Sequence, residues 1–266
     1  MLSAGKIAEV AKISMKSSLS YITAAWGAFI VTVLQIFIFY YIWMAVYGGH
    51  SYLNGISKEK MIMYIILSRI LYTQISWSFI NIIGGMVHSG QIAMELLMPI
   101  DFQLSMYIGR MGDFIAFSSL TTVPAFIICV LSLGFYLPDN PLIYVYFGIS
   151  LFMALTIAFF AEFFIGMMAF YTTNTWGLRA LYESVVSFFS GALIPLVFFP
   201  GWLKQAVNFL PFKDMIYTPV SIFLGLVNNR QICESLLFQA VWVIGLFIIS
   251  RWFFLFAVRK ITVQGG

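Results

Sequence analysis

The sequence predicts an all-α integral membrane protein with six transmembrane helices, and two observations carry this prediction. Charged residues make up 9% of the 266 residues and hydrophobic residues 62%, whereas about a quarter of an ordinary soluble domain is charged. The few charges are separated by apolar runs of the length, about 20 residues, that a helix needs to cross the hydrocarbon layer. The whole chain, 1–266, therefore reads as a single membrane domain.

Six apolar runs are separated by polar or turn-forming segments. They cover, in order, about residues 22–46, 61–87, 111–137, 142–171, 184–200 and 235–258. The first two runs form a predicted hairpin, because Gly48 and Gly49 lie just after the first. Pro138-Asp139-Asn140-Pro141 is a turn signal between the third and fourth runs. Residues 1–20, which precede the first run, are predicted to lie at the cytoplasmic membrane surface.

Lysine and arginine beside the spans set the predicted orientation, since basic residues favour the cytoplasmic side. With a cytoplasmic N-terminus, the inner group is the larger one. It contains Lys6, Lys12, Lys16, Arg110, Arg179, Arg259 and Lys260, against Lys58, Lys60, Lys204, Lys213 and Arg230 outside. An even number of spans places the C-terminus in the cytoplasm as well. The pattern predicts a multi-pass protein of the cell membrane.

The segment 88–109 connects the second and third spans and is predicted to carry a cytoplasmic surface helix. Ile92 and Leu96 alternate with the polar Gln91 and Glu95 at helical spacing. Pro99 ends this helix, because proline disfavours helix at the preceding residue, and Asp101 follows. Such a helix, attached at both ends to spans, transmits a push from a soluble partner as a rigid-body movement. The alternative is a connector that only closes the end of the bundle.

The segment from Ser187 to Leu226 is predicted to be a broken helix at membrane depth. It contains four prolines, and each removes a backbone donor and clashes with the preceding turn. The segment is nevertheless too apolar for a solvated loop, and broken helices persist in membranes where protein or a water-filled cavity satisfies their backbone groups. We expect a span ending near Pro200, followed at 201–226 by two short re-entrant helices on the extracellular side. They form either a lid over an exit or a structural plug.

Arg69 and Glu162 are ionisable residues within predicted spans. Each lies roughly 13–14 Å from its own membrane face at about 1.5 Å per residue, so the two reach similar depths in a core about 30 Å thick. Pairing is the usual way in which the membrane tolerates such groups. An Arg69–Glu162 pair is predicted, either as a structural link or as a contact with a substrate or proton.

Several classes of function are excluded by the sequence. No Gly-x-x-x-x-Gly-Lys-Ser/Thr run is present, so the chain has no phosphate-binding loop of its own. No catalytic nucleophile motif occurs, and Cys129 and Cys233 have no metal-ligand spacing. Basic residues form no patch for nucleic acid. We expect no catalytic residue, no metal and no cofactor bound by this chain.

Two stretches in this order of spans carry a family resemblance. They are Ser-Gly-Gln-Ile-Ala…Leu-Leu-Met-Pro-Ile-Asp at 89–101, and Gly-Ala-Leu-Ile-Pro-Leu-Val-Phe-Phe-Pro-Gly-Trp-Leu from Gly191, followed by Leu-Pro-Phe. Over nearly its whole length the chain resembles the transmembrane subunit of a type-2 ABC exporter. The amphipathic helix that some members place before the first span is matched only modestly by residues 3–20.

The resemblance implies a permease that works as a dimer, with itself or with a different permease, in a bacterial cell membrane. Each half rests on a cytoplasmic ABC ATPase subunit, which binds ATP and magnesium. Residues predicted to contact that ATPase are Gln91, Glu95, Leu96, Pro99 and Asp101. Residues predicted at the extracellular gate are Gly191, Pro195, Phe198, Phe199, Pro200 and Trp202.

The function predicted from the sequence is ATP-driven export of a hydrophobic or amphiphilic substrate, such as a lipid, a drug or a peptide. Two alternatives stay open. One is a stand-alone secondary transporter or channel, which predicts repeated halves, and no convincing inverted repeat is visible between 22–137 and 142–258. The other is a membrane anchor without transport activity, for which the broken segment after Ser187 would be dispensable.

Overall fold

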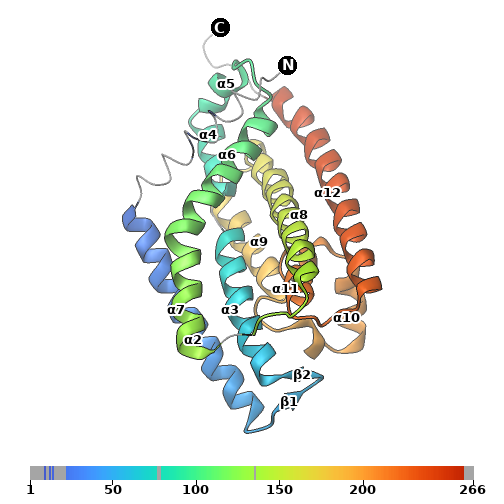
Figure 1. Ribbon diagram of the computed structural model, residues 1–266. Coiled ribbons are helices and arrows are strands. Elements are labelled where there is room, and N and C mark those ends of the chain that lie inside the picture. Colours follow the sequence, from blue (N-terminus) through green and yellow to red (C-terminus); the bar gives the residue numbers. More distant parts are fainter. Residues whose placement is uncertain are drawn as a thin grey trace.

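The computed structural model describes residues 22–260 except 77, 78 and 135, together with Glu9, Lys12 and Ser14. The N-terminal segment predicted at 1–20 lies outside the described residues, these three apart. The described chain is an all-α bundle with one small β-hairpin (Figure 1). Its fold class is therefore confirmed as that of an all-α membrane protein.

The helices follow each other with short connections. The longer ones are α2 Ile22–Tyr47, α3 Lys58–Ile75, α4 Phe79–His88, α6 Phe102–Phe117, α7 Val123–Leu133, α8 Pro141–Gly166, α9 Thr175–Phe189 and α12 Asn229–Ala257. Shorter elements are β1 Tyr52–Leu53, β2 Ile56–Ser57, α5 Gln91–Leu96, α10 Gly201–Asn208 and α11 Tyr217–Phe223. Five turns of 3-10 or π-helix complete the described chain: η1 Ser118–Thr122, η2 Met167–Phe170, η3 Leu196–Phe198, η4 Pro211–Met215 and η5 Val258–Lys260.

Five helices in the described chain are long and apolar enough to cross a membrane. They are Thr23–Tyr47, Lys58–His88, Phe102–Leu133, Pro141–Phe170 and Asn229–Lys260. Four of the predicted spans, the first, second, fourth and sixth, match these ranges closely. The third begins at Phe102, nine residues before its predicted start at Met111, so residues 102–109 of the predicted surface segment 88–109 belong to α6.

The fifth predicted span, 184–200, is not one continuous helix in the structure, because only residues 184–189 belong to an α-helix, α9. Helix α9 begins at Thr175, ends at Phe189 and contains 15 residues. At about 1.5 Å per residue it is about 22 Å long, shorter than a hydrocarbon layer of about 30 Å. Gly191 follows the helix with φ +82°, a conformation that glycine adopts without strain. The apolar run continues past this turn, and hydropathy alone did not reveal where the helix ends.

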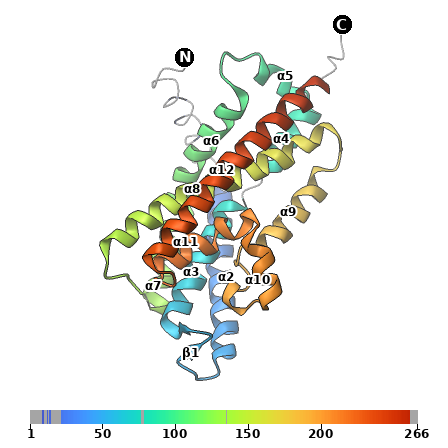
Figure 2. The same cartoon turned by 90° about the vertical axis from the view of Figure 1, so that its right-hand side faces the viewer.

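The bundle has two distinct ends (Figures 1 and 2). Helix α5 and the C-terminal end of α12 lie at one end. The β-hairpin, the start of α8, helix α10 and the start of α12 lie at the other. The hairpin follows from its turn residues, because Asn54 and Gly55 both have positive φ. We call these the α5 end and the hairpin end.

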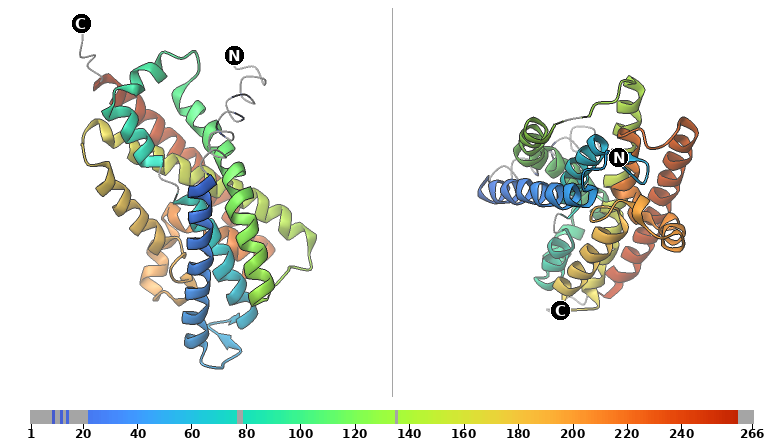
Figure 3. Two further views of the ribbon diagram at one scale, coloured as in Figure 1. Left: turned by 90° about the vertical axis from the view of Figure 1, so that its left-hand side faces the viewer. Right: turned by 90° about the horizontal axis from the view of Figure 1, so that it is seen from below.

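Helix α8 is central and packs against α4, α11 and α12. Helix α2 packs on α3 and α7 (Figure 3), and most of its surface is exposed, as expected for a helix that faces lipid. Toward the α5 end, the core is a cluster of stacked aromatic rings from α4, α6, α8 and α12. We call it the aromatic cluster, and it contains Phe79, Phe102, Phe159, Phe163 and Phe254.

Candidate functional site

Helix α5 presents an apolar surface at the tip of the α5 end. Gly90 precedes the helix with φ +75°, and Ile92 anchors it because its side chain is only 2% exposed. Three apolar side chains point outward instead: Met94, Leu97 and Met98 are 67%, 80% and 53% exposed. We call these three residues the α5 patch. Flexible methionines and a leucine on an exposed surface suit an adaptable docking contact.

The predicted contact residues of this segment have different environments. Gln91 and Glu95 lie one turn apart on the exposed surface of α5, with the Gln91 amide donating to the Glu95 carboxylate at 3.5 Å. Leu96 is the last residue of α5 and packs on the aromatic cluster. The helix ends at Leu96, three residues before Pro99, which lies in the bend that leads to α6.

Asp101 has a role within the chain. Its carboxylate accepts a hydrogen bond from the Leu104 backbone N–H at 3.0 Å and so caps the N-terminus of α6. The other carboxylate oxygen forms an ion pair with Arg251 of α12 at 2.6 Å. Asp101 thus joins α6 to α12 at the base of the α5 segment. Sequence analysis did not predict this pairing, because the two residues are 150 positions apart.

The predicted Arg69–Glu162 ion pair does not form in the structure. Arg69 donates to the backbone carbonyl of Ala192, and its guanidinium lies over the Phe39 ring, 4.2 Å from the centroid. The reason for the difference is span length. The two spans contain 31 and 30 residues, so each is about 45 Å long at about 1.5 Å per residue. Arg69 lies near the hairpin end of its span and Glu162 near the α5 end of its own. In spans of this length the two residues therefore lie at different levels.

Glu162 belongs instead to a buried polar cluster where α3, α6, α8 and α9 meet. Its charged neighbours are Arg110, Glu183 and Arg179. Arg110, 7% exposed, donates to the backbone carbonyl of Gln74 at 2.6 Å and so caps the last turn of α3. The Gln74 amide donates to Thr122 in the π-helical turn η1. Arg110 of α6 therefore contacts the C-terminal end of α3, just before the chain continues to α4.

The first gate residue, Gly191, forms the turn after α9 at the hairpin end. Its carbonyl accepts a hydrogen bond of 2.7 Å from the buried Tyr64 hydroxyl of α3. The next carbonyl, that of Ala192, accepts from Arg69, one turn and a half further along α3. Two side chains of α3 thus hold two consecutive carbonyls that no helix satisfies. This contact between residues about 125 positions apart carries no local sequence signal.

The remaining gate residues lie around η3 and the start of α10. Pro195 precedes η3, where Phe198 packs on Trp43 of α2 at 4.8 Å between ring centroids. Phe199 is 8% exposed and stacks on Phe188. Pro200 is the N-cap residue of α10. Trp202 is 72% exposed and faces away from this packing.

The structure therefore places four of the six, Gly191, Pro195, Phe198 and Phe199, in one segment, Gly191–Phe199, which we call the aromatic turn.

A cavity of about 440 Å³ opens between α2, α3, α6 and α9. Hydroxyl and amide side chains line it, together with Arg179, which pairs with Glu183 at 2.7 Å. Its lining residues are Ala28, Val31, Thr32, Gln35, Tyr72, Thr73, Ser76, Phe117 and Arg179. Thr32 and Thr73 share a hydrogen bond of 3.1 Å across it. Polar groups on an otherwise apolar membrane-facing surface indicate a path or an interface rather than a lipid contact.

A family model described as ABC-2 family transporter protein matches residues 19–265. No curated protein matches the chain.

Proposed function

The chain belongs to the ABC-2 family of transporter proteins and is a multi-pass membrane component of an ABC transporter, and on this premise we propose that it is the permease of an ATP-driven exporter. The α5 patch carries this proposal. A permease without a phosphate-binding loop needs a separate motor, and the α5 patch is an exposed apolar surface at the tip of the α5 end (Figure 1).

The ABC ATPase subunit is proposed to hold ATP and magnesium and to dock on α5. Gln91 and Glu95 flank the apolar contact with polar groups, while Asp101 transmits the movement because it joins α6 to α12. On this proposal the α5 end, with both termini, is cytoplasmic in a bacterial cell membrane. The basic residues beside the spans support that orientation.

The sixth crossing is proposed to be made by α9 together with the segment up to α11. Helix α9 alone is too short, but η3, α10, η4 and α11 lie beyond it at the hairpin end (Figure 2). Helices α10 and α11 are then the re-entrant pair. Residues Thr218–Phe223 of α11 are buried against α8, which supports a position at membrane depth rather than in solvent.

The substrate is proposed to be hydrophobic or amphiphilic and to move outward. The polar cavity between α2, α3, α6 and α9 supports a path shared with a second permease, identical or different, on that face. The aromatic turn at Gly191–Phe199 closes the outer end of this path. Tyr64 and Arg69 hold the aromatic turn to α3. Because α4 and α5 follow α3 along the chain, a movement of α5 can reach this turn, which supports its role as a gate.

The test combines labelling and partner binding. Cys233 is exposed and is first replaced by serine, while Cys129 is buried. We expect Met98→Cys to resist a membrane-impermeant thiol reagent in intact cells and Tyr52→Cys, on the hairpin, to react. We also expect Leu97→Asp to lose co-purification with a soluble subunit that carries a phosphate-binding loop, and the control Tyr52→Asp to retain it.

Labelling of Met98→Cys from outside would refute the orientation and the docking of a cytoplasmic motor. Transport that continues after nucleotide depletion would instead favour a secondary transporter. If the chain binds the soluble subunit but no substrate is moved, the chain would be a membrane anchor without transport activity.

A further inference from the structure

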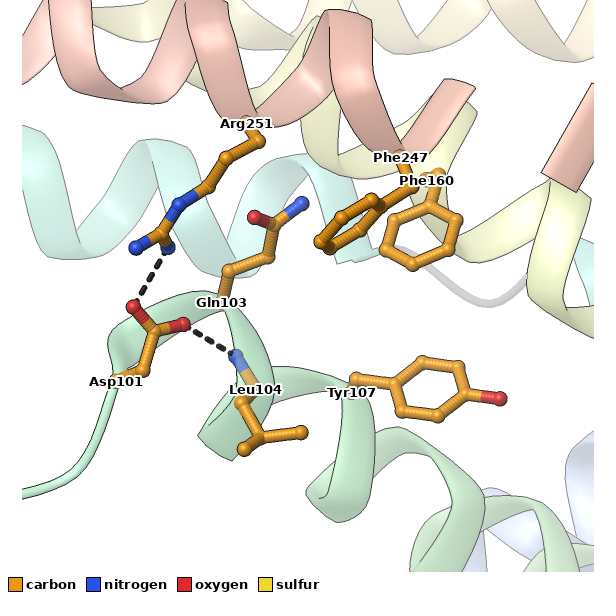
Figure 4. Close-up of a pocket in the computed structure, with 7 residues that line it drawn as sticks. All are labelled: Asp101, Gln103, Leu104, Tyr107, Phe160, Phe247 and Arg251. Atoms are coloured by element: carbon orange, nitrogen blue, oxygen red, sulfur yellow. Dashed lines mark hydrogen bonds and ion pairs between the residues drawn. The ribbon is translucent and has the colours of Figure 1, made fainter. Parts of the chain in front are cut away.

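A second cavity, of about 400 Å³, lies on another face of the bundle, between α6, α8 and α12 near the α5 end. Its volume is in the range of about 300–1,000 Å³ that is typical of ligand sites. Figure 4 shows its two chemically different sides. Asp101 and Arg251 form one side, and the rings of Tyr107, Phe160 and Phe247 form the other.

The charged side keeps unused binding capacity. Arg251 pairs with Asp101 through Nη1, although a guanidinium has five N–H donors. Its side chain is 34% exposed and that of Asp101 37%. An ion pair of this kind offers a negative and a positive group side by side. It complements a ligand that also carries both charges close together.

Gln103 supplies a third polar group. The residue is 3% exposed and its amide nitrogen donates to the Ser250 hydroxyl at 2.8 Å. Because that hydroxyl donates to the Phe247 carbonyl, it can only accept from Gln103, and this fixes the amide orientation. The amide oxygen is then left without a partner, on the side of Arg251 in Figure 4. A buried acceptor without a donor is unfavourable, so this side of the cavity favours a ligand with an N–H group.

The aromatic side is suited to a hydrocarbon chain. Tyr107 and Phe160 are stacked at 5.9 Å between centroids, with an angle of 7° between the ring planes. Phe247 meets Phe160 edge to face at 5.4 Å. The Tyr107 hydroxyl is bonded to Thr156 at 2.9 Å, so this polar group is satisfied within the protein. The cavity thus runs from charged groups at the membrane surface to rings at membrane depth.

We propose that this cavity binds a membrane phospholipid with a primary ammonium head group, such as a phosphatidylethanolamine. The ammonium is held by the Asp101 carboxylate and the Gln103 amide oxygen, and the phosphate by the free N–H groups of Arg251. One acyl chain lies along Tyr107, Phe160 and Phe247. A choline head group carries no N–H donor, so the site distinguishes the two lipids. The site lies apart from the proposed transport path between α2 and α9. If the α5 end is cytoplasmic, the bound lipid belongs to the inner leaflet, and only this assignment rests on the proposed function.

The experiment measures lipid selectivity of the purified, delipidated full chain. The protein is incubated with equal amounts of dioleoyl-phosphatidylethanolamine and dioleoyl-phosphatidylcholine, and bound lipid is quantified by native mass spectrometry. We expect the wild type to be enriched about tenfold in the ethanolamine lipid, as one hydrogen bond to a charged group is worth about that factor. Asp101→Asn keeps an acceptor for the α6 cap and removes the charge, and we expect it to lose most of the enrichment.

Gln103→Leu should also lose the enrichment, because it removes the amide oxygen. Glu234→Gln is the matched control: it alters the ion pair Arg230–Glu234 at the hairpin end and should leave selectivity unchanged. Equal binding of both lipids by the wild type would overturn the proposal without reference to any variant. Selectivity unchanged in both Asp101→Asn and Gln103→Leu would overturn it too. Displacement of the lipid by soluble phosphoethanolamine would show a site for the free head group and refute the membrane lipid as its ligand.

Discussion

Replacing Gly191 with alanine tests the turn that ends α9. At this position φ is +82°, and a Cβ atom would lie 2.8 Å from the Tyr64 hydroxyl and 3.2 Å from the Tyr217 Cβ. The left-handed conformation costs a residue with a side chain about 1–2 kcal/mol. Displacing the Tyr64 hydroxyl leaves a buried carbonyl without its donor, which costs about 1–3 kcal/mol more. We therefore expect Gly191→Ala to lower the free energy of unfolding by about 2–5 kcal/mol in total.

The measurement is equilibrium unfolding of the purified protein in detergent, followed by circular dichroism. Gly201→Ala is the matched control, since Gly201 lies in the same segment and a Cβ there would meet nothing within 4 Å. We expect the control to change stability by less than about 1 kcal/mol, as helix interiors prefer alanine to glycine. A similar loss from both substitutions would refute the assignment of the loss to the geometry at Gly191.

A double-mutant cycle with Tyr64→Phe separates the two causes. Without the hydroxyl, the hydrogen bond and its clash are both absent, so Gly191→Ala should cost only the backbone strain of about 1–2 kcal/mol. If the full penalty persists in the Tyr64→Phe background, the Tyr64 contact is not its origin.

Three further substitutions test the buried contacts by the same measurement. Arg69→Lys should destabilise the chain by about 1–3 kcal/mol. Lysine lacks the planar group that bonds to the Ala192 carbonyl and lies over the Phe39 ring. Unchanged stability would contradict the contact between Arg69 and Ala192. Arg110→Leu should cost more than the double variant Arg110→Leu/Glu162→Gln, since the second change removes the buried charge that the first leaves isolated; a double variant no more stable than the single one would separate the two residues. Gly84→Leu should cost about 1–3 kcal/mol or more, because even a Cβ there would lie 2.5 Å from a methyl group of Thr175, and unchanged stability would mean that α4 and α9 are not in close contact.

Hydropathy predicted the spans whose apolar runs coincide with single helices. Helices α2, α8 and α12 are of this kind, because their membrane-facing residues are apolar over the full length. The start of α6 at Phe102 was missed since its buried face carries Gln103 and Arg110, whose polar groups bond to Ser250 and Gln74 within the protein. The pattern near Pro195 correctly predicted a broken segment but displaced the helix before it.

The partners of the charged residues could not be read from the sequence. Arg69 bonds to a backbone carbonyl. Every residue carries such a group, so the sequence does not show which residue supplies it. Arg251 and Asp101 are 150 positions apart, and only the arrangement of α6 beside α12 brings them together. Close helix contacts leave a local trace where they require a small residue, and Gly84 of α4, where a Cβ atom would meet Thr175 of α9, is such a position.

The aromatic cluster has a mechanical consequence. Rings from four helices pack against one another in this cluster, and packed interiors transmit strain, so the half of the bundle nearest α5 resists shear. A displacement applied at α5 would be carried to α6, α8 and α12 together, as in a stiff lever arm. The opposite half is tied to its aromatic turn by two carbonyl contacts from α3. A displacement applied at α5 therefore passes through the ring-packed half of the bundle before it reaches the aromatic turn.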